Sequence, residues 1–328
     1  MVERHFYMVD TGVQFSNEVP TVNIMNYLIT LKCPKKCSFC FSKKLNELMS
    51  FTDFQEFIQH DKKVFESKRI SLLGGEPTTH PEFGKFLNYA LEQYSSVSVF
   101  SNLMVPKKNI EDFVKLASTY GYKLRVIWNN SEINYSSKLE AKSIDIAIKL
   151  TQTGAKMYHS VTYTPGLELA YLLPIAKKTN IYKLRFALNV ADMKILASDE
   201  NIKFLIKQLQ LLDDNGFTVS LDSCGFIPVI VNPLMRLQLI KFFGSYKQCS
   251  GSIGADILPD GRLIPCMPYL EDPKDVYLTK ITNREHLMEE YVAHYGPQSY
   301  NPNKNDILCP AYFHPNRIKG KIIPISLV

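Results

Sequence analysis

The sequence predicts an α/β protein built on a parallel sheet, and two observations support that prediction. Short runs rich in β-branched and aromatic residues alternate along the chain with amphipathic helical stretches. Parallel neighbouring strands need crossover connections, usually helices, so this alternation is typical of a barrel or an open parallel sheet. The chain, at 328 residues, is also long enough for such a domain with an appended module.

The number of predicted strands favours an open, partial (β/α)6 TIM-like barrel over a closed eight-unit barrel. Strands are predicted at 21–30, 69–73, 96–100, 123–128, 157–164 and 182–190, and 217–223 is a further candidate. The first helix is predicted with Thr52 as its N-cap, and the second with Pro81 in its first turn. The helices are predicted at 51–68, 81–94, 107–119, 137–153 and 199–215.

The composition changes after residue 223. The tail is rich in proline, glycine and turn residues, and it holds four of the seven cysteines. A segment this irregular needs a metal centre to hold it together. We therefore expect an N-terminal extension over 1–20, a barrel over 21–220 and a small cysteine-rich module over 221–328.

The overall composition is that of a soluble globular protein, with 45% hydrophobic and 21% charged residues. The net charge of +6 is mild, and no motif indicates nucleic-acid binding. No apolar run is long enough to span a membrane, and the N-terminus is not a targeting peptide, so we expect a cytoplasmic protein. In that reducing compartment, seven cysteines favour metal ligands over disulfides.

Three of these cysteines, Cys33, Cys37 and Cys40, form a CxxxCxxC motif on a loop that follows the first predicted strand. A zinc site usually uses CxxC pairs and a fourth ligand, and a thioredoxin-like motif uses one CxxC that opens a helix. Three thiolates on a loop can instead hold three irons of a cubane, which leaves the fourth iron without a protein ligand.

A second motif accompanies the first. The segment LLGGEPTTHPEF, at 72–83, follows the second predicted strand. CxxxCxxC with aromatic Phe39 before its last cysteine, paired with GGEP, resembles the signature of the radical S-adenosylmethionine (SAM) superfamily. The resemblance implies that the three cysteines ligate a [4Fe–4S] cluster whose fourth iron is chelated by SAM. It also implies that Phe39 packs near the adenine.

The resemblance assigns further SAM contacts. Gly74, Gly75, Glu76 and Pro77 are expected to line the methionine amino group of SAM. Weaker candidates lie at strand ends or within strands, where ordinary strand-end or core hydrogen bonding is the alternative. They are Ser101, Asn102, Asn129, Asn130 and Arg185.

The remaining cysteines resemble the start of an auxiliary-cluster domain called SPASM, or its shortened form, the twitch domain. Cys249, Gly261 and Cys266 have its C-x11-G-x4-C spacing, and a hairpin turning at 259–261 would bring both cysteines to one end. We expect one auxiliary [4Fe–4S] cluster, held by Cys224, Cys249, Cys266 and Cys309 or by three of them. Alternatively, Cys224 is a free thiol that gives a hydrogen atom to a substrate radical.

The implied reaction is reductive cleavage of SAM to a 5′-deoxyadenosyl radical, which abstracts hydrogen from a substrate. The expected electron donor is a flavodoxin or a ferredoxin. The expected substrate is a ribosomally synthesised peptide, modified by epimerisation or oxidative cross-linking. The alternatives are a small-molecule dehydrogenase and an iron–sulfur electron carrier without SAM turnover; GGEP disfavours the carrier, which has no use for a methionine-binding motif.

Two features leave the substrate open. Only residues 1–20 precede the first predicted strand, too few for the leader-binding domain of many peptide-modifying relatives. His159 and Tyr163 share a face of the fifth strand, where they either contact substrate or form a satisfied core pair. Asp222 and Glu168 are candidate proton acceptors for a substrate that is being oxidised.

Overall fold

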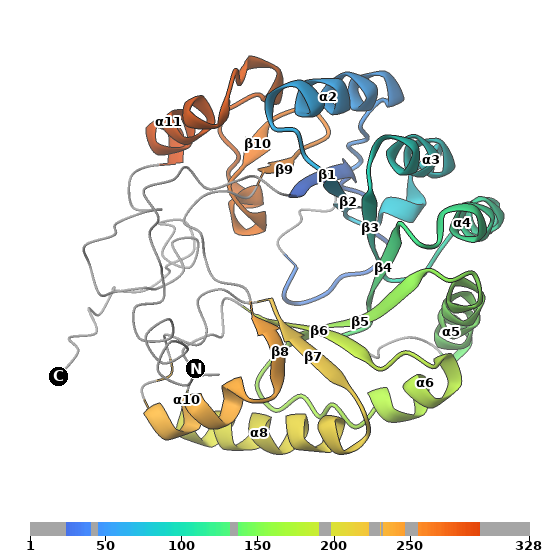
Figure 1. Ribbon diagram of the computed structural model, residues 1–328, viewed down its shortest axis with the longest axis vertical. Helices are drawn as coiled ribbons and strands as arrows, with labels where there is room; N and C mark the ends of the chain where they lie inside the picture. Colours follow the sequence, from blue (N-terminus) through green and yellow to red (C-terminus); the bar gives the residue numbers. More distant parts are fainter. Residues whose placement is uncertain are drawn as a thin grey trace.

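The computed structural model describes residues 24–40, 45–131, 137–189, 198–222, 230, 232–246 and 255–295. These residues form a curved, ten-stranded sheet with helices around its outer side (Figure 1). The strand order is β10-β9-β1-β2-β3-β4-β5-β6-β7-β8, and the two edge strands do not pair with each other. The predicted open α/β barrel is thus confirmed.

All neighbours from β1 to β8 are parallel, and β9 is parallel to β1. Only β10, which pairs with β9, is antiparallel among the described strands. The strands are β1 (Ile24–Thr30), β2 (Arg69–Gly74), β3 (Ser96–Ser101), β4 (Leu124–Asn129), β5 (Lys156–Tyr163), β6 (Lys183–Leu188), β7 (Thr218–Leu221), β8 (Phe243–Tyr246), β9 (Ala255–Ile257) and β10 (Leu263–Ile264).

The helices fill the crossovers between the strands, as the alternating sequence pattern predicts. The α-helices are α2 (Phe51–Val64), α3 (Phe83–Gln93), α4 (Lys107–Tyr120), α5 (Ser137–Gln152), α6 (Leu172–Thr179), α8 (Asp199–Asp214), α10 (Pro233–Ile240) and α11 (Arg284–Tyr295). Short 3-10 helices are η1 (Pro77–Thr79), η3 (Met267–Glu271) and η4 (Leu278–Lys280). No helix in these described ranges is long and apolar enough to cross a membrane.

The sheet is longer than the six strands that the sequence predicts. The candidate strand at 217–223 forms as β7, and β8 pairs with it. β9 pairs with β1 at the other edge. The sheet therefore continues across the expected module boundary near residue 220, and the division into 1–20, 21–220 and 221–328 stays a prediction.

Two helix starts differ from the prediction. Ser50, not Thr52, caps α2: its hydroxyl oxygen accepts a hydrogen bond from the backbone N–H of Asp53 (3.0 Å). The predicted Thr52 cap is therefore wrong. α3 begins at Phe83 rather than at Pro81, because the chain first makes the η1 turn and the backbone N–H of Phe83 then bonds to the carbonyl of His80 (3.1 Å).

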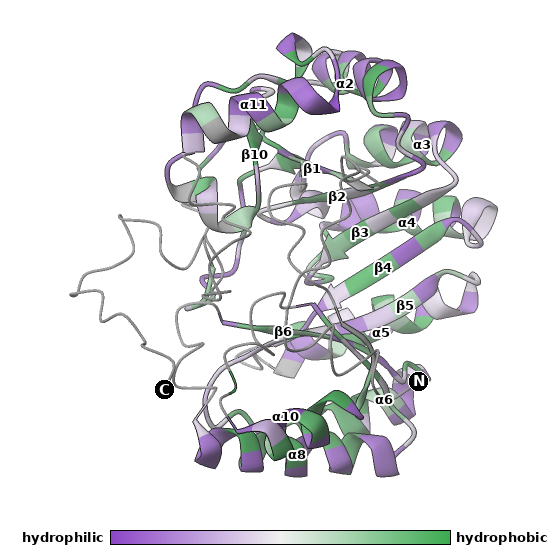
Figure 2. Cartoon of the chain, turned by 60° about the vertical axis from the view of Figure 1, so that its left-hand side comes forward, coloured by the Kyte–Doolittle hydropathy of each residue, from purple (hydrophilic) through white to green (hydrophobic). Residues whose placement is uncertain are grey.

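The main hydrophobic core lies between the sheet and the helices. In α8, for example, the buried residues recur at helical spacing on the side that faces the sheet, and the other side is hydrophilic (Figure 2). Along each strand, residues that pack against helices alternate with residues that face the barrel interior. On β3, Val97 and Val99 are fully buried in the core, whereas Ser98 and Phe100 are half-buried.

Candidate functional site

The cysteine motif lies on a loop that is closed at its base against the end of β1. The backbone N–H of Leu31 donates to the carbonyl of Glu47 (3.0 Å), and that of Met49 donates to Ile29 (2.9 Å). Both ends of the loop are thereby held at the carboxyl edge of the parallel strands, where sites in such sheets are usually built. Within the loop, Cys33 and Cys37 are half-buried and Cys40 is exposed.

The glycine pair after β2 holds the start of this loop. The backbone N–H of Gly75 donates to Thr30 (2.7 Å), and that of Glu76 donates to Lys32 (2.8 Å). A Cβ atom on Gly74 would lie 2.0 Å from the carbonyl oxygen of Thr30, and one on Gly75 would lie 2.2 Å from that of Lys32. Glycine is thus required at both positions for the strand end to approach the cysteine loop.

Glu76 joins the second motif to the end of β3. Its carboxylate is 1% exposed and accepts hydrogen bonds from the hydroxyl and backbone N–H of Thr78 (2.6 and 3.2 Å). It also accepts from the Ser101 hydroxyl (2.7 Å) and the Asn102 backbone N–H (2.7 Å). Burial raises the pKa of Glu76 above its usual value, and these hydrogen bonds oppose the rise. With both oxygens engaged, Glu76 positions the β3 end rather than presenting a free carboxylate.

The end of β3 reaches the cysteine loop directly. The side-chain amide of Asn102 lies 4.0 Å from the sulfur of Cys33. Ser101 and Asn102 are 0% and 5% exposed, and Pro77 is buried beside them. The structure therefore brings together the candidates on the first three strands. Phe39 lies half-buried on the loop.

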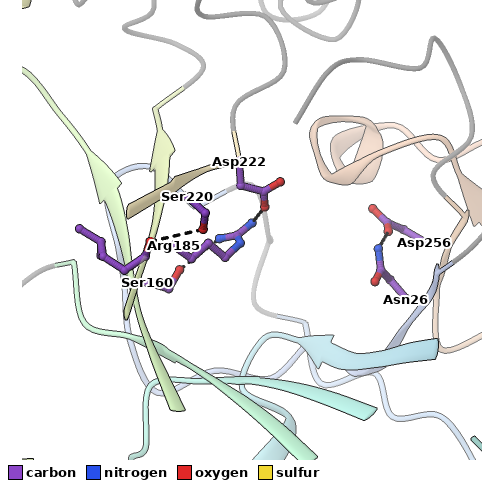
Figure 3. A network of polar contacts seen from close by, with 7 residues as sticks. Asn26, Ser160, Arg185, Ser220, Asp222 and Asp256 are labelled. Carbon is purple, nitrogen blue, oxygen red and sulfur yellow. Dashed lines mark hydrogen bonds and ion pairs between the residues drawn. The ribbon is translucent and has the colours of Figure 1, made fainter. Parts of the chain in front are cut away.

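A polar row lies on the interior face of the opposite part of the barrel. Asn129, Ser160, Arg185 and Ser220 are register neighbours on β4, β5, β6 and β7. The Arg185 guanidinium donates to the Ser160 hydroxyl (3.1 Å) and forms an ion pair with Asp222, which follows β7 (Figure 3). Across the barrel, the side chain of Asn26 donates to Asp256 (2.6 Å) (Figure 3). No sequence motif pointed to Asn26 or Asp256.

Apolar residues occupy the same face two positions before the polar row on β4 and β5. Leu28 pairs with Leu73, and Phe100 pairs with Ile127, which pairs in turn with Tyr158. The Arg185 guanidinium carbon lies 5.1 Å from the centre of the Phe100 ring, so these apolar residues support the polar row from below.

Two of the weaker candidates belong to the outer core. The ring of His159 is fully buried: its Nε2 donates to the Ile181 carbonyl (3.1 Å), and its Nδ1 accepts from the Asn130 amide (2.9 Å). Both ring nitrogens of His159 are therefore satisfied in the core, and Asn130 makes the core hydrogen bond that was its alternative to SAM binding, although its Oδ1 has no partner among the described residues. Tyr163 is also 0% exposed and packs on Phe186 (ring centres 5.3 Å apart), but its buried hydroxyl has no hydrogen-bond partner among the described residues, so the expected satisfied pair of His159 and Tyr163 does not form.

The buried His159 predicts a pH-dependent stability. Burial lowers the pKa of His159 to about 4, whereas unfolded histidine titrates near ~6.5. The unfolded chain then binds the proton more tightly, so stability is full above pH ~6.5 and falls as the pH drops toward 4. We expect a loss of about 3 kcal/mol in the free energy of unfolding, measured by denaturant titration.

A His159→Gln variant cannot titrate at this position and should lose that part of the pH slope. The matched control is His286→Gln, which changes a histidine on the outer face of α11 whose side chain is 32% exposed. Equal pH slopes for the wild type and His159→Gln would contradict the assignment of a neutral core histidine.

Only Cys266 of the second cysteine set lies within the described residues; Cys224, Cys249 and Cys309 lie outside them. The predicted hairpin is present: β9 and β10 pair, and Gly261 in the turn has φ +83°. Cys266 follows β10 and packs on an apolar cluster that includes Leu28 and Leu31, next to the first cysteine loop. The candidate proton acceptor Glu168 is exposed.

The first cysteine set has the donors of an iron–sulfur cluster: three thiols on one anchored loop. In the part of the chain that the structure describes, no three His, Cys, Asp or Glu side chains are gathered tightly enough for a single metal ion. A cubane is ligated at separate irons, and its three thiolates stand further apart than the ligands of one ion. The loop chemistry therefore fits a cluster, with Cys33, Cys37 and Cys40 as the residues that would hold it.

The fold and this site define a class of protein: an open parallel barrel with a three-cysteine loop after β1 that is tied to a glycine turn after β2. Residues 27–125 match the family model described as the radical SAM superfamily. The matched range contains the cysteine loop, the glycine turn and the β3 end. This part of the chain therefore resembles radical SAM proteins, and the match supports an enzyme.

Two curated proteins share part of the sequence. AlbA of Bacillus subtilis (strain 168), an antilisterial bacteriocin subtilosin biosynthesis protein, is 25% identical over 113 residues, 34% of this chain and 25% of AlbA. An S-adenosylmethionine-dependent nucleotide dehydratase of Fibrobacter sp. (strain UWH6) is 24% identical over 156 residues, 44% of this chain and 45% of the dehydratase. The chain spans less than half the length of either relative.

Solved structures share the fold. SuiB of Streptococcus suis, bound to its precursor peptide SuiA, superposes with a TM-score of 0.60 at 16% identity, over 86% of this chain and 67% of SuiB. The anSMEcpe protein with bound AdoMet and a peptide superposes with a TM-score of 0.53 at 16% identity, over 82% of this chain and 80% of that chain. At these identities the likeness establishes the fold alone.

Proposed function

We propose that this protein is a radical SAM enzyme that modifies a ribosomally synthesised peptide, by epimerisation or by oxidative cross-linking. The observation that carries the proposal is the backbone connection between the cysteine loop and the glycine turn. The peptide substrate is supported by the name of AlbA, a bacteriocin biosynthesis protein, and by the fold shared with a structure that holds a precursor peptide.

The cofactors in this proposal are a [4Fe–4S] cluster and SAM, which together supply a 5′-deoxyadenosyl radical that removes a hydrogen atom from the substrate. Cys33, Cys37 and Cys40 hold the cluster. The Gly74–Pro77 turn offers backbone groups to the methionine part of SAM, because its glycines leave no side chain in the way. Phe39 lies near the adenine.

The remaining polar candidates orient the reactants. Glu76 fixes Ser101 and Asn102 at the strand end nearest the loop. Asn129 and Arg185 offer hydrogen-bond donors from the opposite wall, and Asp222 and Ser160 hold the guanidinium in place. The apolar side chains under this row give the barrel interior a less polar floor, which favours protection of a radical from side reactions with water.

A second cluster completes the proposal. Cys224, Cys249, Cys266 and Cys309, or three of them, hold an auxiliary [4Fe–4S] cluster, and a flavodoxin or ferredoxin supplies electrons. The position of Cys266 supports this arrangement, because its apolar neighbours include residues at the start of the first cysteine loop.

The decisive experiment counts iron and sulfide after anaerobic reconstitution and then adds SAM and dithionite. We expect about eight irons per chain, falling to about four in the Cys33/Cys37/Cys40→Ala triple variant. The wild type should release methionine and 5′-deoxyadenosine, and the triple variant should release neither. About four irons falling to none would remove the auxiliary cluster from the proposal. Clusters without SAM cleavage would instead indicate an electron carrier.

The substrate is tested by mass spectrometry of short peptides encoded beside the gene, incubated in heavy water. Epimerisation adds deuterium without other change, whereas oxidative cross-linking removes two hydrogen atoms. A Cys224→Ala variant that keeps both clusters but yields no epimer would assign Cys224 as the hydrogen donor. If the variant instead loses the iron of its second cluster and leaves the peptide unmodified, Cys224 would be assigned as a cluster ligand.

A small-molecule substrate is the second candidate, because the match to the nucleotide dehydratase is longer than the match to AlbA. A dehydrogenase acting on a small molecule belongs to this alternative. SAM cleavage that is stimulated by nucleotides, sugars or aminocyclitols and by none of the peptides would favour it.

A further inference from the structure

The side chain of Asn102 has a fixed orientation beside the cysteine loop. Its carbonyl oxygen accepts a hydrogen bond from the backbone N–H of Met104 (2.8 Å), and its backbone N–H donates to Glu76 (2.7 Å). Because one end of the amide is engaged in this way, the NH2 group is the end that points to the sulfur of Cys33, at 4.0 Å. The side chain is 5% exposed, so water does not compete freely for it.

An unusual turn holds Asn102 in this place. Leu103 has φ +56°, in the left-handed region that non-glycine residues rarely adopt. Its side chain is fully buried in the main core, and its backbone N–H donates to the Ser101 hydroxyl (2.9 Å). Burial of the leucine offsets the backbone strain, so core packing and the Glu76 carboxylate together fix where the amide points.

We propose that Asn102 is a positioning residue that donates a hydrogen bond to the Cys33 thiolate and raises the reduction potential of the SAM-binding cluster. This inference rests on the proposed function, since it requires the cluster at Cys33, Cys37 and Cys40. Reduction adds one electron to the cluster and increases the negative charge on its sulfurs. A neutral N–H donor stabilises that charge, so the reduced form is favoured.

The long distance to Cys33 is consistent with this role. The contact is to a thiol, which is a weak acceptor, and a thiolate that carries charge accepts shorter and stronger hydrogen bonds. The donor also adds no charge of its own, so it shifts the cluster potential without repelling the ammonium group of SAM.

The test is a potentiometric titration of the reconstituted full-length protein, without SAM, followed by electron paramagnetic resonance. The relevant signal is the one that disappears in the Cys33/Cys37/Cys40→Ala triple variant. In Asn102→Ala, we expect about a fivefold lower ratio of reduced to oxidised cluster at the wild-type midpoint, which for one electron is a shift of about 40 mV to more negative potential.

Asn102→Asp is the sharper variant, because it keeps the acceptor for Met104 but removes the donor and adds negative charge. Asn102→Asp should therefore shift the reduction potential to more negative values than Asn102→Ala does. Asn88→Asp, which adds a charge on the exposed side of α3, is the matched control and should leave the potential unchanged.

The outcomes separate this inference from the proposed function. Wild-type protein that forms no cluster would remove the proposed function. Intact clusters with equal potentials in the wild type and both Asn102 variants would overturn the inference alone. Loss of the cluster from both variants while the fold is retained would also overturn it, because Asn102 would then serve assembly rather than the potential.

Discussion

Replacing Gly75 with alanine is expected to destabilise the protein by about 3 kcal/mol or more and to abolish iron binding by the first cysteine set. The new Cβ atom would lie 2.2 Å from the carbonyl oxygen of Lys32, a backbone atom that cannot move without the loop. Relief of the overlap separates the end of β2 from the loop and breaks the hydrogen bonds from Gly75 to Thr30 and from Glu76 to Lys32.

The measurements are denaturant unfolding and iron content after reconstitution. Gly216→Ala is the matched control, since Gly216 has φ +81° but nothing within 4 Å of its added Cβ. That control carries only backbone strain, about 1 kcal/mol, and should bind iron normally. Normal iron content in Gly75→Ala would show that the loop does not depend on this contact.

Replacing Glu76 with glutamine is expected to lower the free energy of unfolding strongly, although the two side chains have the same shape. The glutamine amide must place its NH2 group against either the Asn102 backbone N–H or the Thr78 backbone N–H, both of which are donors. Two donors then face each other in a site that is 1% exposed, so the buried hydrogen bond is lost without water to replace it. We expect a loss of roughly 2–4 kcal/mol in the free energy of unfolding.

The same substitution at Glu82, six residues further along the chain, is the control. Glu82 forms a surface pair with Lys85 and its side chain is 41% exposed, so Glu82→Gln should leave the free energy of unfolding nearly unchanged. Glu76→Gln should also broaden the electron paramagnetic resonance signal of the proposed SAM-binding cluster, because the side chain of Asn102 is no longer held in one orientation. Equal unfolding free energies for the two variants would contradict the role of Glu76 as the link between β2 and β3.

Both motifs were identified from the sequence, and the structure places the two loops in contact, while their roles as cluster and SAM ligands stay predictions. CxxxCxxC and GGEP identify their own chemistry, because thiol spacing and glycine pairs are local properties of the chain. The strands from β1 to β7 were predicted as well, since their alternating and apolar runs are local patterns. β8 was missed, and β9 and β10 were predicted as a hairpin but not as part of the sheet, because the pairing of β8 with β7 and of β9 with β1 depends on residues distant in sequence.

The sequence by itself therefore determined the open barrel, the resemblance to the radical SAM superfamily and the three thiols of the first cysteine set. The tertiary structure alone decided what the neighbouring polar residues do: Glu76 is an internal acceptor, His159 and Asn130 are core partners, and Asn102 points to Cys33. The physical reason is that a side chain's role depends on which donors and acceptors surround it. Those neighbours come from strands far apart in the chain, which only folding brings together.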